Sequence, residues 1–193
     1  DDLRMREFPQ NFGWKHAALR RHQLQDVAAF SETLFVCIVR NPYAFVNSLY
    51  QRPYNLYAKR SRTQAAFCRE PIFLNARDNL PCGIVSGPAE LWTRKVRSYL
   101  ELSDLSNLVV VRYEDVVSRF AEFFAFLRGA GVQVCDSPSP PAESTNNEPM
   151  RFEDYLDKAE RFDPEQVFRV AELECLRPGL APEVCEALGY ERL

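Results

Sequence analysis

The sequence predicts an α/β fold with a central parallel sheet. Two short apolar runs, Leu34–Val39 and Leu108–Val111, are rich in β-branched residues, which is typical of strands covered on both faces. Helical patterns lie before, between and after them. Strands that alternate with helices form βαβ units, in which neighbouring strands run parallel with right-handed connections.

Length and composition indicate a single globular domain over residues 1–193. Of these residues 46% are hydrophobic and 26% are charged, the balance of an ordinary globular protein. A net charge of −3 argues against a nucleic-acid partner, which usually requires a basic excess. No apolar run approaches the length of about 18 residues that spans a bilayer, so we expect no transmembrane segment in this chain.

The N-terminal part of the chain predicts a strand and a helix. Residues 11–16 are expected to form a short strand that ends in Lys15 and His16, and Ala17–Ala29 to form the helix. A histidine at a strand end can accept a proton from a hydroxyl group, and a neighbouring lysine can neutralise developing charge. From the residues alone, the alternative that His16 only satisfies a backbone carbonyl is the more favoured one.

The stretch Leu34–Ser48 combines features of an anion site. Arg40 follows the strand directly, and Asn41-Pro42 indicates the start of a helix that continues to Tyr50. Ligands of α/β proteins bind at the carboxyl ends of strands, where an arginine, a helix N-terminus and the hydroxyl of Ser48 can together hold a phosphate. The alternative is a surface arginine and a solvated serine, and the residues do not decide between the two.

The middle of the chain is less regular. Tyr54–Leu80 is expected to be an irregular insertion, and its basic run Lys59–Arg62 is interpreted as a solvated charge run in preference to a site for an acidic acceptor. Pro81–Pro88 is rich in turn residues but lacks the phosphate-loop pattern. A helix is predicted from Ser86 or Pro88 to Leu102. Its expected apolar face comprises Leu91, Trp92, Val96, Tyr99 and Leu100.

The last third of the chain predicts further helices. Glu114 and Asp115 follow the second strand and are expected to cap a helix over Val116–Arg128. Residues 136–149 are rich in Pro, Ser and Asn and are interpreted as a flexible linker before the C-terminal helices. In the helix expected over Val116–Arg128, the positions that should face inward are Phe120, Phe123, Phe124 and Leu127.

The six cysteines show no metal-binding spacing. No C-x-x-C pair occurs and the two histidines lie apart from most of them, so no zinc site is expected. Cys37 lies in a predicted strand and is interpreted as a core thiol. The pairs Cys68–Cys82 and Cys175–Cys185 could close loops in an oxidising compartment.

Two of these stretches resemble one protein family. Arg40-Asn41-Pro42, followed by Ser48 eight positions after the arginine, is similar to the 3′-phosphate-binding motif of sulfotransferases that use 3′-phosphoadenosine 5′-phosphosulfate (PAPS). Asn107–Asp115, NLVVVRYED, resembles a second segment of the same family. The resemblance extends from about residue 11 to residue 190, and the two motifs together are more specific than either alone.

The resemblance implies a three-layer sandwich with a central parallel sheet, related to the P-loop NTPases. It implies that Arg40 and Ser48 bind the 3′-phosphate of the cofactor and that Tyr113 contacts its adenine. It also implies that His16 is the general base and Lys15 its electrostatic support. PAPS would be the sulfonyl donor, and no metal is expected because basic side chains can neutralise the leaving phosphate.

The chain also departs from the family pattern. Members begin with a strand and a phosphate loop that holds the 5′-phosphosulfate, and this sequence starts downstream of both, so it is interpreted as N-terminally incomplete. Lys15 and His16 are adjacent, whereas some members have one residue between them. The family's C-terminal basic-glycine motif is not found. The compartment would be the cytoplasm for a complete chain and could be the Golgi lumen if an N-terminal anchor is missing.

Three functions follow as hypotheses. The first is transfer of a sulfonyl group from PAPS to a hydroxyl or amine, with a carbohydrate among the candidate acceptors. The alternative is a noncatalytic nucleotide-binding or protein-interaction module on the same fold. A third, a phosphoryl-transfer enzyme of the P-loop class, would need an acidic magnesium ligand that the sequence does not place.

Overall fold

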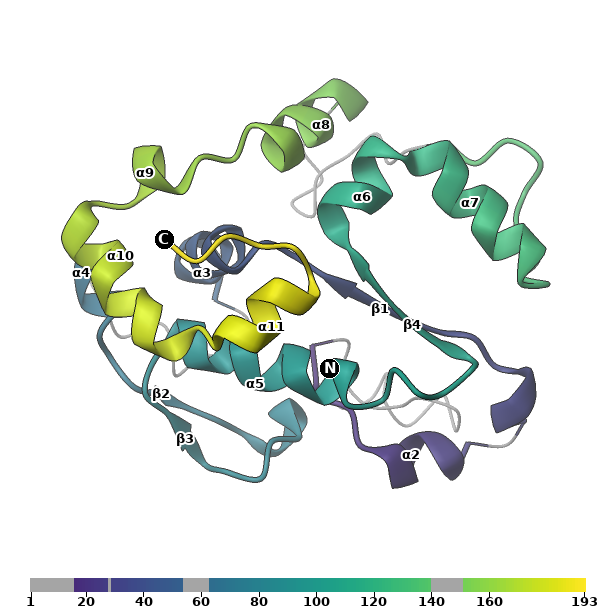
Figure 1. The fold of residues 1–193 in the computed structure, drawn as a ribbon, viewed down its shortest axis with the longest axis horizontal. Coiled ribbons are helices and arrows are strands. Elements are labelled where there is room, and N and C mark those ends of the chain that lie inside the picture. The colour runs from purple at the N-terminus through teal and green to yellow at the C-terminus, as the bar shows by residue number, and fades with distance from the viewer. Residues whose placement is uncertain (1–15, 28, 54–62, 140–150) are drawn as a thin grey trace.

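The computed structural model describes residues 16–27, 29–53, 63–139 and 151–193, which fold into a mixture of helices and two small sheets (Figure 1). One sheet pairs two parallel strands and the other is a short antiparallel pair. The strands are β1 (Phe35–Val39) and β4 (Leu108–Arg112) in the parallel sheet, and β2 (Ile72–Phe73) and β3 (Ile84–Val85) in the antiparallel one. This mixture of helices and strands is compatible with the predicted α/β class, and it contains a small parallel sheet.

Helices account for most of the remaining regular structure. The α-helices are α2 (Arg21–Gln25), α3 (Pro42–Gln51), α4 (Gln64–Phe67), α5 (Pro88–Leu100), α6 (Tyr113–Ser118), α7 (Phe120–Gly129), α8 (Phe152–Glu160), α9 (Pro164–Val167), α10 (Val170–Leu176) and α11 (Pro182–Ala187). Three 3₁₀ turns are η1 (Phe30–Glu32), η3 (Ala76–Asp78) and η4 (Arg177–Gly179). Within the described ranges no helix is both long enough and apolar enough to cross a bilayer.

The two faces of the parallel sheet are covered unequally. Phe35 and Cys37 of β1 are buried in a cluster with Leu24 of α2, and Tyr99 of α5 packs against it. On the opposite face Ile38 is 52% exposed. The described residues therefore place a helical layer over one face and leave Ile38 open on the other, so they do not complete the expected three-layer sandwich.

Helix α5 forms the centre of the fold. Proline at its first position suits a helix start, and the expected inward residues Leu91, Trp92 and Val96 are all buried. The larger hydrophobic cluster joins this helix to α3, α10 and α11 (Figure 1). Tyr99 packs against both clusters, so α5 connects the sheet with the C-terminal helices.

The helix predicted for Ala17–Ala29 is much shorter than expected. The Ala18 N–H donates to the Asp78 carbonyl oxygen at 2.9 Å, and the Tyr99 hydroxyl donates to the Ala17 carbonyl oxygen at 2.9 Å. Because tertiary partners satisfy these backbone groups, the chain stays non-helical until α2 begins.

A buried ion pair fixes the turn on which this segment rests. Lys95 Nζ lies 2.7 Å from Asp78 Oδ1, and the two side chains are 6% and 0% exposed. Asp78 Oδ2 also accepts the Asn75 N–H at 3.1 Å. Burial lowers the pKa of Lys95, an effect that the Asp78 carboxylate opposes. Removing one member of such a pair leaves an uncompensated buried charge, so the pair ties η3 firmly to α5.

Two further sequence predictions need correction. Tyr54–Leu80 is not irregular throughout, because its described part contains α4, β2 and η3. The helix expected over Val116–Arg128 is divided at Arg119 into α6 and α7. The apolar face of α7 is also less buried than expected, and its members Phe120, Phe123, Phe124 and Leu127 are only half-buried.

The described residues test the expectations for the cysteines but do not cover two other predicted segments. None of the six cysteines is in a disulfide, so neither Cys68–Cys82 nor Cys175–Cys185 is paired. Cys37 is a buried core thiol, as expected. The basic run Lys59–Arg62 and most of the linker 136–149 lie outside the described residues.

Candidate functional site

The candidate site lies at the carboxyl ends of β1 and β4. The parallel register pairs Val39 with Arg112, so the next residue of each strand, Arg40 and Tyr113, come side by side. The Arg40 guanidinium carbon lies 5.2 Å from the centroid of the Tyr113 ring, a cation–π contact. The structure therefore brings together two of the residues that the motifs single out.

The charge of Arg40 is not neutralised by a neighbouring acid. The side chain is half-buried, and in the part of the chain that the structure describes no carboxylate forms an ion pair with it. Guanidinium groups match phosphate with two parallel N–H donors. A half-buried arginine that lacks a carboxylate partner is thus suited to an anionic ligand.

Ser48 lies on the same side of α3 as the N-cap residue Asn41, which follows Arg40. It follows the N-cap residue Asn41 by seven positions, which is close to two full turns and about 10 Å along the helix axis. Both residues are half-buried, whereas Pro42, Tyr43 and Val46 between them are buried. Asn41, the residue after Arg40, and Ser48 therefore share one side of α3.

The backbone amides at the start of α3 already have acceptors. Asn41 Oδ1 accepts the N–H groups of Tyr43 at 3.0 Å and Ala44 at 3.2 Å, and Pro42 has no N–H. The Asn41 N–H itself donates to Glu114 Oε1 at 2.9 Å. The sequence suggested that this helix N-terminus would help to hold a phosphate. Because these amides already have acceptors, an anion at this helix N-terminus could be bound only by side chains and by the helix dipole.

The main chain around Arg40 is held by side chains from distant elements. The Trp92 indole N–H donates to the Arg40 carbonyl oxygen at 2.9 Å. The Tyr190 hydroxyl lies 2.7 Å from Glu114 Oε2 and 3.2 Å from the Val39 carbonyl oxygen. Residues of α5, of α6 and of the chain after α11 thus fix the turn that carries Arg40.

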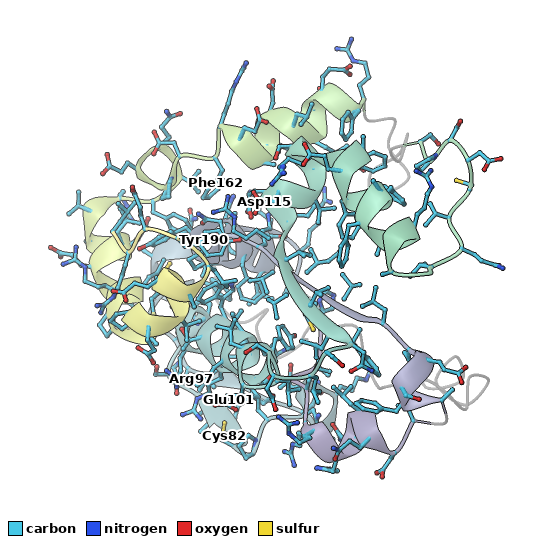
Figure 2. All side chains as sticks on the ribbon, turned by 45° about the vertical axis from the view of Figure 1, so that its right-hand side comes forward. Cys82, Arg97, Glu101, Asp115, Phe162 and Tyr190 are labelled. Atoms are coloured by element: carbon cyan, nitrogen blue, oxygen red, sulfur yellow. The ribbon has the colours of Figure 1, made fainter. Side chains whose placement is uncertain are left out.

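Glu114 makes other contacts than the helix cap that the sequence analysis expected. It was expected to cap α6 together with Asp115, but no side chain caps that helix. Asp115 Oδ2 instead lies 2.9 Å from Arg112 Nε, and Figure 2 shows Asp115 and Tyr190 beside the ends of the strands. The local sequence carries no signal for a partner at position 190, because only the fold brings it near.

The two tyrosines of the site keep their protons. Burial raises the pKa of Tyr113, and the nearby Arg40 charge opposes this shift. Burial and then the Glu114 carboxylate raise the pKa of Tyr190. Both phenols are therefore neutral near pH 7, and Tyr190 acts as a hydrogen-bond donor to Glu114.

Of the two predicted catalytic residues, Lys15 and His16, the structure describes only His16. Lys15 lies outside the described residues, and His16 is half-buried at their start. Ala17, the next residue, is anchored to Tyr99, while Arg40 is anchored to Trp92. Trp92 and Tyr99 are seven residues apart on α5, so these two anchors lie on one side of the helix, about 10 Å apart along its axis.

Neither metals nor known relatives add to this site. Within the described ranges no three His, Cys, Asp or Glu side chains lie together so as to hold a metal ion. No family model, no curated protein and no solved structure matches this chain. The functional argument therefore rests on the residues and their geometry.

Proposed function

We propose that this chain is a PAPS-dependent sulfotransferase domain that moves a sulfonyl group to a hydroxyl or amine acceptor, with carbohydrates among the candidates. One observation carries the proposal. Arg40, the arginine of the 3′-phosphate motif, is half-buried at the end of a parallel strand, stacks on Tyr113 and lacks an ion-pair partner among the described residues.

Each residue of the strand-end site has a role that suits its chemistry. The Arg40 guanidinium would donate two N–H groups to the 3′-phosphate, and the Ser48 hydroxyl would add a third donor. Tyr113 would contact the adenine through its aromatic ring. These roles need no metal ion, because guanidinium and hydroxyl donors act on the phosphate directly.

The transfer step is assigned to the other end of the site. The acceptor oxygen or nitrogen would form a bond to sulfur while the bond from sulfur to the phosphate oxygen breaks, and 3′-phosphoadenosine 5′-phosphate would leave. The His16 imidazole would take the proton of the acceptor, and Lys15 would stabilise the charge on the transferring group.

The binding half of the proposal is tested by thermal unfolding with and without 3′-phosphoadenosine 5′-phosphate. At 100 times its Kd, the ligand adds about 2.7 kcal/mol, which raises Tm by roughly 5–10 °C for a domain of this size. At the same ligand concentration Arg40→Ala should reduce that rise to about half or less, and Arg119→Ala should keep it, because Arg119 pairs with Glu122 on the surface. An unchanged rise in Arg40→Ala would refute this site.

A noncatalytic nucleotide-binding module is the second candidate. It requires the strand-end residues and not His16, and among them Arg40 and Tyr113 are in contact. Transfer from radiolabelled PAPS to a panel of phenols, amines and glycans distinguishes the two. Transfer that His16→Ala abolishes supports the enzyme, whereas nucleotide binding without transfer supports the module.

A further inference from the structure

We propose that Glu114 and Tyr190 are positioning residues that couple anion binding at Arg40 to the docking of the C-terminal segment, residues Leu188–Leu193. The ligand part of this inference rests on the proposed function. The coupling itself concerns the main chain of Val39–Asn41, which connects Arg40 to both residues.

Glu114 joins two parts of the chain that are remote in sequence. Its Oε1 accepts the Asn41 N–H at 2.9 Å, and its Oε2 accepts the Tyr190 O–H at 2.7 Å. One carboxylate therefore holds both the residue after Arg40 and the C-terminal segment. A charged acceptor makes stronger hydrogen bonds than a neutral one, so the bridge opposes movement of either part.

The hydroxyl of Tyr190 has a second acceptor in reach. It lies 3.2 Å from the Val39 carbonyl oxygen, on the other side of Arg40 in the chain. The ring is fixed as well, because Arg112 stacks on it at 5.3 Å and Trp92 meets it edge-on at 6.1 Å. Tyr190 is 8% exposed, so its docking excludes water from the turn that carries Arg40.

The end of the C-terminal segment contacts the start of α3 independently. The Leu193 N–H donates to the Tyr43 hydroxyl oxygen at 2.7 Å, and the Tyr43 hydroxyl lies 3.1 Å from the Leu193 carbonyl oxygen. Gly189 has a φ of 65°, a left-handed conformation that lets the chain turn sharply after α11. The segment thus reaches both Val39 and Tyr43, on either side of Arg40.

Coupling between two sites is reciprocal. If the docked segment orients Arg40, a ligand on Arg40 must in turn favour the docked segment. Ligand binding should therefore slow hydrogen exchange at residues 188–190, which do not belong to the proposed phosphate site. Loss of the Tyr190 hydroxyl should in turn weaken the ligand.

The first test measures the Kd of 3′-phosphoadenosine 5′-phosphate by calorimetry, at a temperature where every variant is folded. Tyr190→Phe keeps the ring and removes one hydrogen bond, so affinity should fall about threefold to tenfold. Glu114→Ala should lower it at least as much, and Glu114→Gln should lower it less than Glu114→Ala, because the amide oxygen keeps one of the two hydrogen bonds. An unchanged Kd in Tyr190→Phe would overturn the coupling.

The matched control is Tyr99→Phe. This change also removes a buried tyrosine hydroxyl with a backbone acceptor, the Ala17 carbonyl oxygen. It should lower Tm and leave the Kd unchanged. A Kd that Tyr99→Phe weakens as much as Tyr190→Phe would mean that both changes act through general stability, which would overturn the positioning role.

The second test needs no ligand and separates the coupling from the proposed function. In the ligand-free protein, Tyr190→Phe should speed hydrogen exchange of the Asn41 amide, while Tyr99→Phe should not. Faster exchange without any nucleotide binding to the wild type would leave the coupling standing and refute the proposed ligand. Equal exchange in Tyr190→Phe and wild type would refute the coupling.

Discussion

Arg40 and Arg112 lie at the carboxyl ends of adjacent strands, one position apart in the register, and differ in their surroundings. Each stacks on a tyrosine, Arg40 on Tyr113 at 5.2 Å and Arg112 on Tyr190 at 5.3 Å. Arg112 is neutralised by Asp115 at 2.9 Å, whereas no described carboxylate pairs with Arg40. An arginine with its own acid stabilises the fold, and one without is available to an external anion.

The largest effect expected from this contrast is on ligand affinity. Arg40→Ala removes charged hydrogen bonds that contribute about 1.5–3 kcal/mol, so the Kd of 3′-phosphoadenosine 5′-phosphate should rise by about 10- to 150-fold. The free energy of unfolding should fall by no more than about 1 kcal/mol, because the stacking on Tyr113 is lost but no native ion pair is. Arg40→Lys should recover only part of the affinity, since it keeps the charge but not the planar fork. Calorimetry and urea unfolding measure the two quantities.

A second prediction concerns the pH range in which the stability of the fold is constant. Burial raises the pKa of the Cys37 thiol on β1 to about 11, above the value of about 8.5 for a free thiol. The unfolded chain then releases a proton before the folded one, so the stabilisation is complete below about pH 8.5 and is lost as the pH rises towards 11.

Cys37→Val lacks this proton, so its stability relative to wild type should increase by about 2–3 kcal/mol between pH 8 and pH 11. Urea unfolding at several pH values measures this. Cys135→Val, at an exposed position, should follow the wild-type curve in this range. Parallel curves for wild type and Cys37→Val would contradict the burial of this thiol.

The third prediction concerns the other arginine. Arg112→Ala removes the stacking on Tyr190 and the partner of Asp115, so it should lower the free energy of unfolding by about 1–2 kcal/mol. Arg112→Lys should lose less, because it keeps the charge. Chemical denaturation measures both. A stable Arg112→Ala variant would show that the paired arginine is not structural and would remove the contrast.

The smallest effect is expected at Ser48. Ser48→Ala removes one hydroxyl donor, so the Kd of 3′-phosphoadenosine 5′-phosphate should rise about threefold to tenfold, with no change in stability. Ser103→Ala, at an exposed turn, is the matched control and should leave the Kd unchanged. An effect equal to that of Arg40→Ala would instead indicate that Ser48 orders the helix.

Local patterns in the sequence predicted the parts of the fold whose partners are near in sequence. The strand before Arg40, the helix that begins at Pro42 and the helix through Trp92 all lie close to their expected limits. Each has a short-range cause, such as a β-branched run or a proline at the first helical position. Arg40 and Tyr113 each follow a strand as predicted, whereas their contact was not predicted from the sequence.

The remaining features depend on contacts between distant residues, which no local pattern reveals. Ala17 stays outside a helix because Tyr99 holds its carbonyl oxygen. Glu114 accepts hydrogen bonds from Asn41 and Tyr190 and does not cap α6. At the start of α3 the Asn41 N–H depends on Glu114, while Asn41 Oδ1 accepts the Tyr43 and Ala44 amides locally, so the sequence overstated the role of that helix N-terminus.

The most direct test of the central claim compares two nucleotides on two proteins by calorimetry. Adenosine 5′-monophosphate lacks the 3′-phosphate that 3′-phosphoadenosine 5′-phosphate carries, so their affinity ratio isolates the binding of that group. Wild type should prefer the 3′-phosphorylated nucleotide by at least about 10- to 150-fold, and Arg40→Ala by no more than the roughly threefold to tenfold that Ser48 supplies. Equal preference in the two proteins would show that Arg40 does not bind the 3′-phosphate.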